Sequence, residues 1–322
     1  LIFAKLMNYD FLVIGAGISA CTCTSFLNKR FSDASILLVD QGRRIGGRST
    51  TRKSRKNSIL EFDHGLPSFS INKNISQDIL KLILPLIHSK NLINITKETL
   101  MINESGKIEN SSINQITYRG FPFMRNFCEE ILNQSINKKN INISLETIVK
   151  SLIFKNDMWE LVVNNKRVIN SKNIILSSSL IAHPRCLEIL NINSIPLRDA
   201  FEIGIDETVD AVLRMTKKQN YLKRKNFILY VSSTEIVDTF NHQYLQIYFS
   251  NLIRDKFNFE RIIFQKQSDG SMIIVLHCFY LNKFDDISID NLIKLLNKIF
   301  FKYHQFINLF KNARIIDIMD WR

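Results

Sequence analysis

A glycine-rich turn between an apolar strand and a helix constrains the fold more than any other feature of the sequence. Residues 9–14 are largely apolar, as a buried parallel strand requires. The turn Gly15-x-Gly17-x-x-Ala20 follows at once, and the residues after it continue as a helix. In such a turn the first glycine permits a tight bend and the second lets backbone approach a ligand. A small third residue lets helix and strand pack closely.

An acidic residue ends the second strand of this unit. The apolar run 36–39 leads into Asp40, at the place where nucleotide-binding proteins carry an acid that accepts hydrogen bonds from a ribose. The helix N-terminus between the strands would face the negative phosphates. Strand, turn, helix, strand and acid in this order predict the amino-terminal half of a Rossmann fold that binds a dinucleotide. These residues alone leave FAD and NAD both open.

A second glycine-rich segment follows Asp40. It contains the doublet Gly46-Gly47 followed by Arg48, within a stretch rich in arginine. The segment resembles the second glycine motif of flavoprotein oxidoreductases, in which the doublet closes a loop over the pyrophosphate and the arginine lies beside it. This resemblance favours FAD as the cofactor.

A third motif, Phe62-Asp-His-Gly65, resembles the FDxG segment that passes near the flavin ring of such proteins. Together the motifs resemble the renalase-like branch of the FAD-dependent amine oxidase superfamily, strongly over residues 9–69 and thinly elsewhere. The resemblance implies that Gly65 lies near the ring and that His64 acts beside it, in positioning rather than as a general base. It also implies that the backbone of Val149 contacts the adenine.

The resemblance implies an oxidoreductase that passes hydride from a small reduced substrate to FAD, and electrons from there to oxygen or another acceptor. The donor is a reduced nicotinamide isomer, with an amine as second choice. Leu66-Pro-Ser68 replaces the usual Ala-Gln-Tyr, which leaves the substrate open. The family has a further strand and helix beyond its terminal Trp-Arg, so we expect the carboxy-terminal part of the FAD domain to be missing. A non-catalytic flavin-binding remnant and an NAD-dependent dehydrogenase remain as alternatives.

The expected fold class is α/β, with an FAD-binding Rossmann-type domain of the amine-oxidase type interleaved with a mixed α+β substrate domain. We assign residues 1–69, 119–183 and 313–322 to the FAD-binding domain. Residues 70–118 and 184–312 are assigned to the substrate domain.

Composition argues against several other classes of protein. The five cysteines are scattered without a CxxC pair, and the six histidines show no metal-ligand spacing, so neither disulfides nor a bound metal are expected. The net charge of +13 includes a basic run over 43–56, where a diphosphate would give a local reason for it. A nucleic-acid patch would interleave its basic residues with exposed aromatic ones, whereas this run contains a glycine doublet, so no nucleic-acid partner is expected.

The expected location and partners follow from what the sequence lacks. No stretch approaches the ~18 apolar residues of a membrane helix, and residues 1–6 do not resemble a signal peptide. We therefore expect a cytoplasmic protein whose partner is a small-molecule substrate, with no membrane association. The sequence does not indicate an oligomeric state.

Overall fold

The chain folds into two compact units, each built from two separate stretches of sequence. The computed structural model describes residues 7–54, 60–72, 74–111, 115–164, 167–178, 180–220, 222–232, 234–279 and 287–321. The first unit comprises Leu1–Thr50 and Met124–Asn220, and the second comprises Thr51–Phe123 and Tyr221–Arg322. The units are therefore interleaved along the chain.

The first unit is built on a six-stranded sheet with the order β10-β2-β1-β13-β12-β11. Its strands are β1 (Met7–Ile14), β2 (Ile36–Val39), β10 (Ile141–Ser144), β11 (Val149–Lys155), β12 (Met158–Val163) and β13 (Val168–Leu176). Strands β10, β2, β1 and β13 run parallel to one another, and β12 and β11 extend the sheet as an antiparallel meander. Helix α1 (Ile18–Arg30) joins β1 to β2, which confirms the predicted β-α-β unit.

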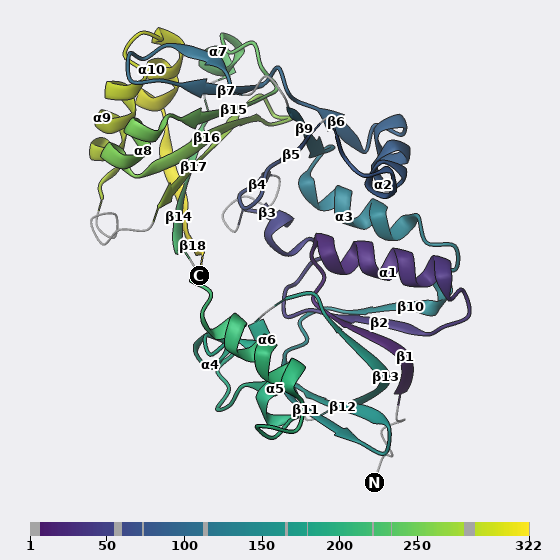
Figure 1. Cartoon of the computed structure of the whole chain (residues 1–322). Helices are drawn as coiled ribbons and strands as arrows, with labels where there is room; N and C mark the ends of the chain where they lie inside the picture. Colours follow the sequence, from purple (N-terminus) through teal and green to yellow (C-terminus); the bar gives the residue numbers. More distant parts are fainter. Residues whose placement is uncertain are drawn as a thin grey trace. The chain divides into compact units, whose positions relative to one another are not determined.

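Both faces of this sheet are covered, which explains why its central strands are apolar throughout. Leu12 and its neighbour Val13 point to opposite faces of β1, yet both are fully buried. Helices α1 and α3 (Met124–Asn133) lie side by side on one face (Figure 1). The other face packs against apolar side chains from four short helices. The helices are η4 (Leu180–Ala182), α4 (Cys186–Ile189), α5 (Pro196–Asp199) and α6 (Glu207–Lys217).

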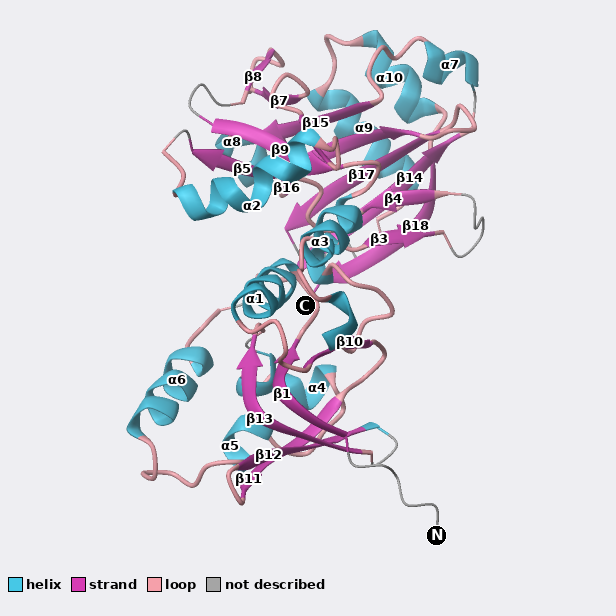
Figure 2. Ribbon diagram, turned by 90° about the vertical axis from the view of Figure 1, so that its right-hand side faces the viewer, coloured by secondary structure: helices cyan, strands magenta, loops and turns pink. Residues whose placement is uncertain are grey.

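The second unit is built on a seven-stranded sheet with the order β18-β14-β17-β16-β15-β7-β8. Its strands are β7 (Thr99–Ile102), β8 (Ile108–Asn110), β14 (Arg224–Val231), β15 (Tyr244–Phe249), β16 (Phe259–Lys266), β17 (Met272–Phe279) and β18 (Arg314–Trp321). All neighbouring strands pair antiparallel except β15 and β7. Figure 2 shows β18 running alongside β14 at one edge.

Different layers cover the two faces of this second sheet. On one face, helices α9 (Ile289–Ile299) and α10 (His304–Lys311) complete a large cluster rich in phenylalanine. On the other face, Leu60, Phe62 and Ile95 pack against apolar residues of the central strands. The remaining elements of the unit are β3 (Thr51–Lys53), β4 (Glu61–Asp63), β5 (Phe69–Asn72), α2 (Gln77–His88), β6 (Leu92–Asn94), β9 (Gln115–Gly120), α7 (Thr234–Asp238) and α8 (Asn251–Phe257).

The compact units divide the chain differently from the predicted FAD-binding and substrate domains. Residues 51–69 and 119–123 lie in the second unit, because Leu60 and Phe62 pack on its seven-stranded sheet, and β5 and β6 both pair with β9. Residues 313–322 also belong there, since β18 pairs with β14 along its length. Residues 184–220 belong to the first unit, because α4, α5 and α6 contribute apolar side chains to the cluster under its sheet. Each shift follows from pairing or packing between residues far apart in sequence.

The phenylalanine cluster of the second unit offers a matched test of core packing. Phe300 is fully buried, whereas its neighbour Phe301 is 54% exposed. We expect Phe300→Ala to lower the free energy of unfolding by about 3–5 kcal/mol, because it removes a ring from the close-packed cluster. Phe301→Ala should change it by less than about 1 kcal/mol. Urea unfolding followed by far-UV circular dichroism measures both, and equal losses would contradict this description of the core.

Candidate functional site

The turn after β1 has a backbone conformation that only glycine adopts without strain. Gly15 has a φ of +116°, and its N–H donates to the Val39 carbonyl at 2.7 Å. A side chain at this position would collide with the hydroxyl of Ser177, which follows the end of β13. Gly15 therefore brings the chain tightly round from the carboxyl end of β1 into α1, as the sequence pattern predicts.

Gly17 is the N-cap of α1, and here the fold itself does not require a glycine. Its φ of −81° is open to any residue, and an added Cβ would find its nearest neighbour, the Gly46 carbonyl oxygen, 4.0 Å away. Among the described residues no side chain caps this helix, and its first turn contains no acid. The N-terminal N–H groups at the positive end of the helix dipole are therefore not capped by a described side chain, which is the arrangement that binds phosphate.

The second glycine segment packs directly against this helix start. Gly46 and Gly47 have φ values of +120° and +55°. The Gly46 N–H donates to the Ala16 carbonyl at 2.8 Å, and Gly46 forms an isolated parallel bridge with Gly17. A Cβ on Gly47 would lie 3.2 Å from the Gly17 Cα. The two loops thus touch backbone to backbone, so both glycines of the doublet are needed.

Arg48 lies in the short helix η1 (Gly47–Ser49) that begins at this contact. Its side chain is exposed, and within the described part of the chain it forms no ion pair. By contrast, the nearby Arg43 lies 3.4 Å from the carboxylate of Glu146. Arg48 therefore provides an uncompensated positive charge beside the contact between the two loops.

Asp40 links the two glycine segments. One carboxylate oxygen accepts the Ala16 N–H at 2.7 Å and the other accepts the Gly42 N–H at 2.6 Å. A carboxylate can accept about four hydrogen bonds, so both oxygens retain capacity for a ligand hydroxyl. Asp40 thus sits at the predicted place at the end of β2, with a structural role in addition to the predicted contact with a ribose.

Two further predicted residues lie within the same unit. Ala20 is fully buried on α1, and Val149 begins β11 and is buried in the core of the unit. The chain before Val149 runs beside the end of β2, because the Thr147 N–H donates to the Asp40 carbonyl at 2.8 Å. Seven of the predicted nucleotide-contacting residues surround or support the start of α1: Gly15, Gly17, Ala20, Asp40, Gly46, Gly47 and Arg48.

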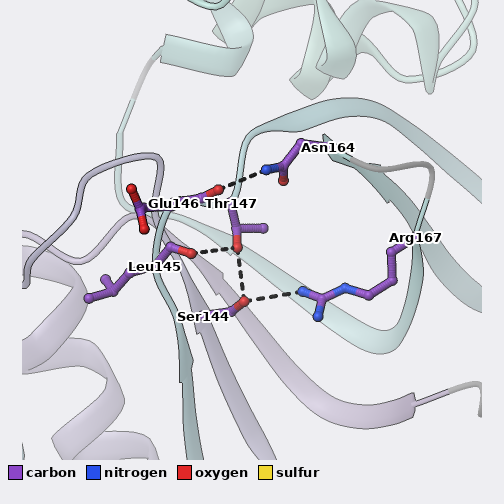
Figure 3. Close-up of a pocket in the computed structure, with 6 residues that line it drawn as sticks. All are labelled: Ser144, Leu145, Glu146, Thr147, Asn164 and Arg167. Carbon is purple, nitrogen blue, oxygen red and sulfur yellow. Dashed lines mark hydrogen bonds between the residues drawn. The ribbon is translucent and has the colours of Figure 1, made fainter.

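A polar cavity of about 230 Å³ adjoins this part of the first unit (Figure 3). Its lining residues are Ser144, Leu145, Glu146, Thr147, Asn164 and Arg167. Arg167 donates to the Ser144 hydroxyl at 3.1 Å, and that hydroxyl pairs with the Thr147 hydroxyl at 2.8 Å. Since these groups satisfy one another, the cavity is polar without an evident missing partner.

His64 and Gly65 belong to the second unit, directly after β4. His64 is 5% exposed, and its ring centroid lies 5.2 Å from that of Trp321. Burial, assisted by the positive charge of Arg52, lowers the pKa of His64 to about 4. The imidazole is therefore uncharged at neutral pH, which suits the predicted positioning role better than that of a general acid.

A buried network that no sequence motif indicates holds Asp63, the residue before His64. The Gln265 side chain binds both backbone groups of Asp63, accepting from its N–H at 2.9 Å and donating to its carbonyl at 2.8 Å. The Asp63 carboxylate accepts from the Thr51 hydroxyl at 2.7 Å and lies 3.6 Å from the guanidinium of Arg119. These contacts fix the backbone that leads into His64. They join residues from distant parts of the chain, so no local pattern announces them.

Comparison with known families places the amino-terminal part of the chain. Residues 13–81 match the family of NAD(P)-binding Rossmann-like domains. The matched region contains both glycine segments, Asp40 and His64. No match is found among curated proteins.

Three solved structures resemble the whole chain. A putrescine oxidase redesigned in its cofactor binding has a TM-score of 0.61 at 9% identity, over 97% of this chain and 85% of that one. A Pyrococcus furiosus protein has a TM-score of 0.56 at 12% identity, over 98% and 88%. A flavoprotein/dehydrogenase from Cytophaga hutchinsonii has a TM-score of 0.53 at 13% identity, and covers 97% of this chain, which spans 66% of its length.

These matches confirm the predicted fold class. The chain has the α/β fold of flavoprotein oxidoreductases, with an NAD(P)-binding Rossmann-like domain interleaved with a mixed α+β part. At these identities the likeness establishes the fold and leaves the activity to be argued from the site.

Two negative findings apply to the described residues. No helix among them has the length and apolar character needed to cross a membrane. No group of three or more histidine, cysteine or acidic side chains lies together there in a way that suits a metal ion.

The lowered pKa of His64 predicts a pH-dependent stability. Below pH 6.5 the unfolded chain binds a proton at this residue, whereas the folded protein does not until about pH 4. Stability should therefore fall as the pH drops through this window, by up to about 3 kcal/mol from this group. The variant His64→Phe should lose that part of the dependence, as measured by urea unfolding at several pH values. The exposed His304→Phe is the control, and identical profiles for wild type and His64→Phe would refute the assignment.

Proposed function

We propose that the chain is an FAD-dependent oxidoreductase of the renalase-like type. The observation that carries this proposal is the open start of α1, where Gly17 lacks a side chain that the fold would accommodate. Where the fold does not require a glycine, a ligand that approaches the backbone closely explains why one is present. An uncapped helix N-terminus indicates that this ligand is an anion, such as a pyrophosphate.

The second glycine loop supports FAD over NAD. A Rossmann turn with one acid suffices for either cofactor. Here Gly46 and Gly47 add a second backbone surface against Gly17, and Arg48 adds a positive charge beside it. This pairing of loops resembles the flavoprotein motif noted in the sequence. Two of the structures with a similar fold are a flavoprotein/dehydrogenase and a putrescine oxidase, which agrees with this choice.

The residues of this chain take the following roles in the proposal. The α1 N-terminus and the glycine loops bind the pyrophosphate, Asp40 accepts from the adenosine ribose, and the backbone of Val149 contacts the adenine. FAD, when bound, supplies the hydride acceptor. The resemblance of residues 62–65 to the FDxG segment gives His64 and Gly65 their proposed role near the ring, in which the neutral His64 imidazole orients the substrate rather than removing a proton from it.

The proposed donor is a small reduced molecule, either a reduced nicotinamide isomer or an amine. Electrons then pass to oxygen or another acceptor. The described residues of the nucleotide site, in the first unit, do not distinguish between the two donors. The nature of the substrate is therefore inferred from the second unit.

The substitution Gly17→Val tests the proposal directly. An isopropyl group here should fill the space over the α1 N-terminus and weaken FAD binding by at least about 100-fold, since it removes several charge-assisted hydrogen bonds. The protein should still fold, because the φ of residue 17 is open to any residue and an added Cβ would lie 4.0 Å from its nearest neighbour, the Gly46 carbonyl oxygen. Titration of FAD into cofactor-free protein, followed by flavin fluorescence, measures the affinity.

The controls separate the alternatives. Phe26→Val, an exposed change on the same helix, should leave FAD binding intact. Binding of NAD in place of FAD, with the same dependence on Gly17, would indicate an NAD-dependent dehydrogenase. Binding of neither cofactor would indicate a non-catalytic protein, and unchanged FAD affinity in Gly17→Val would remove the site from this turn.

A further inference from the structure

A row of polar residues crosses four neighbouring strands of the second unit. Strand register places Asn226 of β14 opposite His277 of β17, His277 opposite Arg261 of β16, and Arg261 opposite Tyr248 of β15. Directly opposed residues of an antiparallel pair project from the same face of a sheet. Four polar side chains therefore stand side by side on one face, next to rows that are mostly apolar.

The charge of Arg261 is buried without a counterion. Its side chain is nearly inaccessible, and it donates through Nε to His277 Nδ1 at 3.2 Å and through a terminal nitrogen to the Tyr248 hydroxyl at 3.0 Å. Both partners are neutral, and within the described part of the chain no carboxylate pairs with it. A buried charge is stable only when it is compensated, so Arg261 lacks the partner that its position demands.

His277 is the neutral partner that accepts from Arg261. Because its Nδ1 accepts from Arg261, the ring proton resides on Nε2. That buried nitrogen faces the His64 carbonyl, which also accepts the Asn226 amide at 2.6 Å, and one carbonyl oxygen can serve both. Burial and the nearby Arg261 hold the pKa of His277 well below its usual value, so the ring is a neutral donor.

Unsatisfied polar atoms belong to the residues in and beside this row. The indole nitrogen of Trp321, which can only donate, is buried without a partner among the described residues. Nδ1 of His64 and the side-chain oxygen of Asn226 are also buried without a hydrogen-bond partner among the described residues. The rings of His64 and Trp321 are in contact, and Asn226 binds the His64 backbone. Native proteins rarely leave several buried polar groups unpaired together, so the cluster indicates a missing ligand.

We propose that Arg261 and Trp321, beside the neutral ring of His277, form a binding site for the carboxylate group of a small substrate. Both side chains are donors, and the uncompensated charge of the site, on Arg261, is positive. The guanidinium of arginine is suited to a carboxylate because it presents parallel N–H groups in a planar fork. This inference rests on the proposed oxidoreductase function and refines it, since of the two proposed donors it selects an amine, and one that also carries a carboxylate.

The test measures anion binding without FAD or turnover. The chain contains two tryptophans, so in a Trp159→Phe background the fluorescence reports on Trp321 alone. Sodium acetate at constant ionic strength should produce a saturable change in this fluorescence, and the neutral isostere acetamide should not. Arg261→Met should weaken the response by at least about tenfold. Arg314→Met, the same change at an exposed position in the unit, should leave it intact.

A conservative variant and a second anion complete the test. Arg261→Lys retains the charge without the fork, so it should respond weakly but measurably even if Arg261→Met does not fold. Equal responses to acetate and acetamide, or an unchanged response in Arg261→Met, would overturn the proposal. Tighter binding of inorganic phosphate than of acetate would overturn the assignment to a carboxylate. Loss of FAD binding with an intact acetate response would refute the oxidoreductase function alone, whereas normal FAD binding with no acetate response would refute only this site.

Discussion

Asp40 holds two glycine loops against the start of α1, and the candidate nucleotide site depends on that contact. Its two carboxylate oxygens bind one backbone N–H from each loop. The loops then meet backbone to backbone at Gly17 and Gly46, which excludes side chains at the doublet. Asp40, Gly46 and Gly47 thereby serve the architecture of the site, whereas Gly17 has a backbone conformation and surroundings that do not require a glycine.

The second unit contains a buried cluster in which some polar atoms have no hydrogen-bond partner among the described residues. The Asp63 carboxylate binds Thr51 and Arg119, and Gln265 binds its backbone, so the chain that leads into His64 is fixed. By contrast, His64 and Trp321, whose rings are in contact, each leave a buried nitrogen unpaired among the described residues. The first cluster therefore has a structural role, whereas the second has donors left for a ligand.

The sequence predicted the parts of this molecule that depend on local order. The β-α-β unit was predictable because an apolar run, glycine spacing and a strand-end acid lie within a few tens of residues of each other. The FAD assignment and the roles of His64 and Gly65 came from resemblance and stay predictions. The boundaries placed residues 313–322 with the wrong unit, since nothing local shows that β18 pairs with β14.

The polar row across the second sheet was beyond sequence analysis for the same reason. His277 looked like one of several scattered histidines, and only strand register brings it beside Arg261. Antiparallel register depends on which distant strands pair, and a shift of one residue would turn every side chain to the other face.

The proposed cofactor site requires that a pyrophosphate binds to the backbone between the two glycine loops. Amide NMR shifts of the isotope-labelled protein, recorded while FAD is added, locate the bound cofactor. We expect the largest shifts at Gly17, Ile18, Gly46, Gly47 and Arg48, and we expect ADP to reproduce most of them. Binding that leaves these five amides unshifted, or that shifts a different part of the first unit instead, would contradict it.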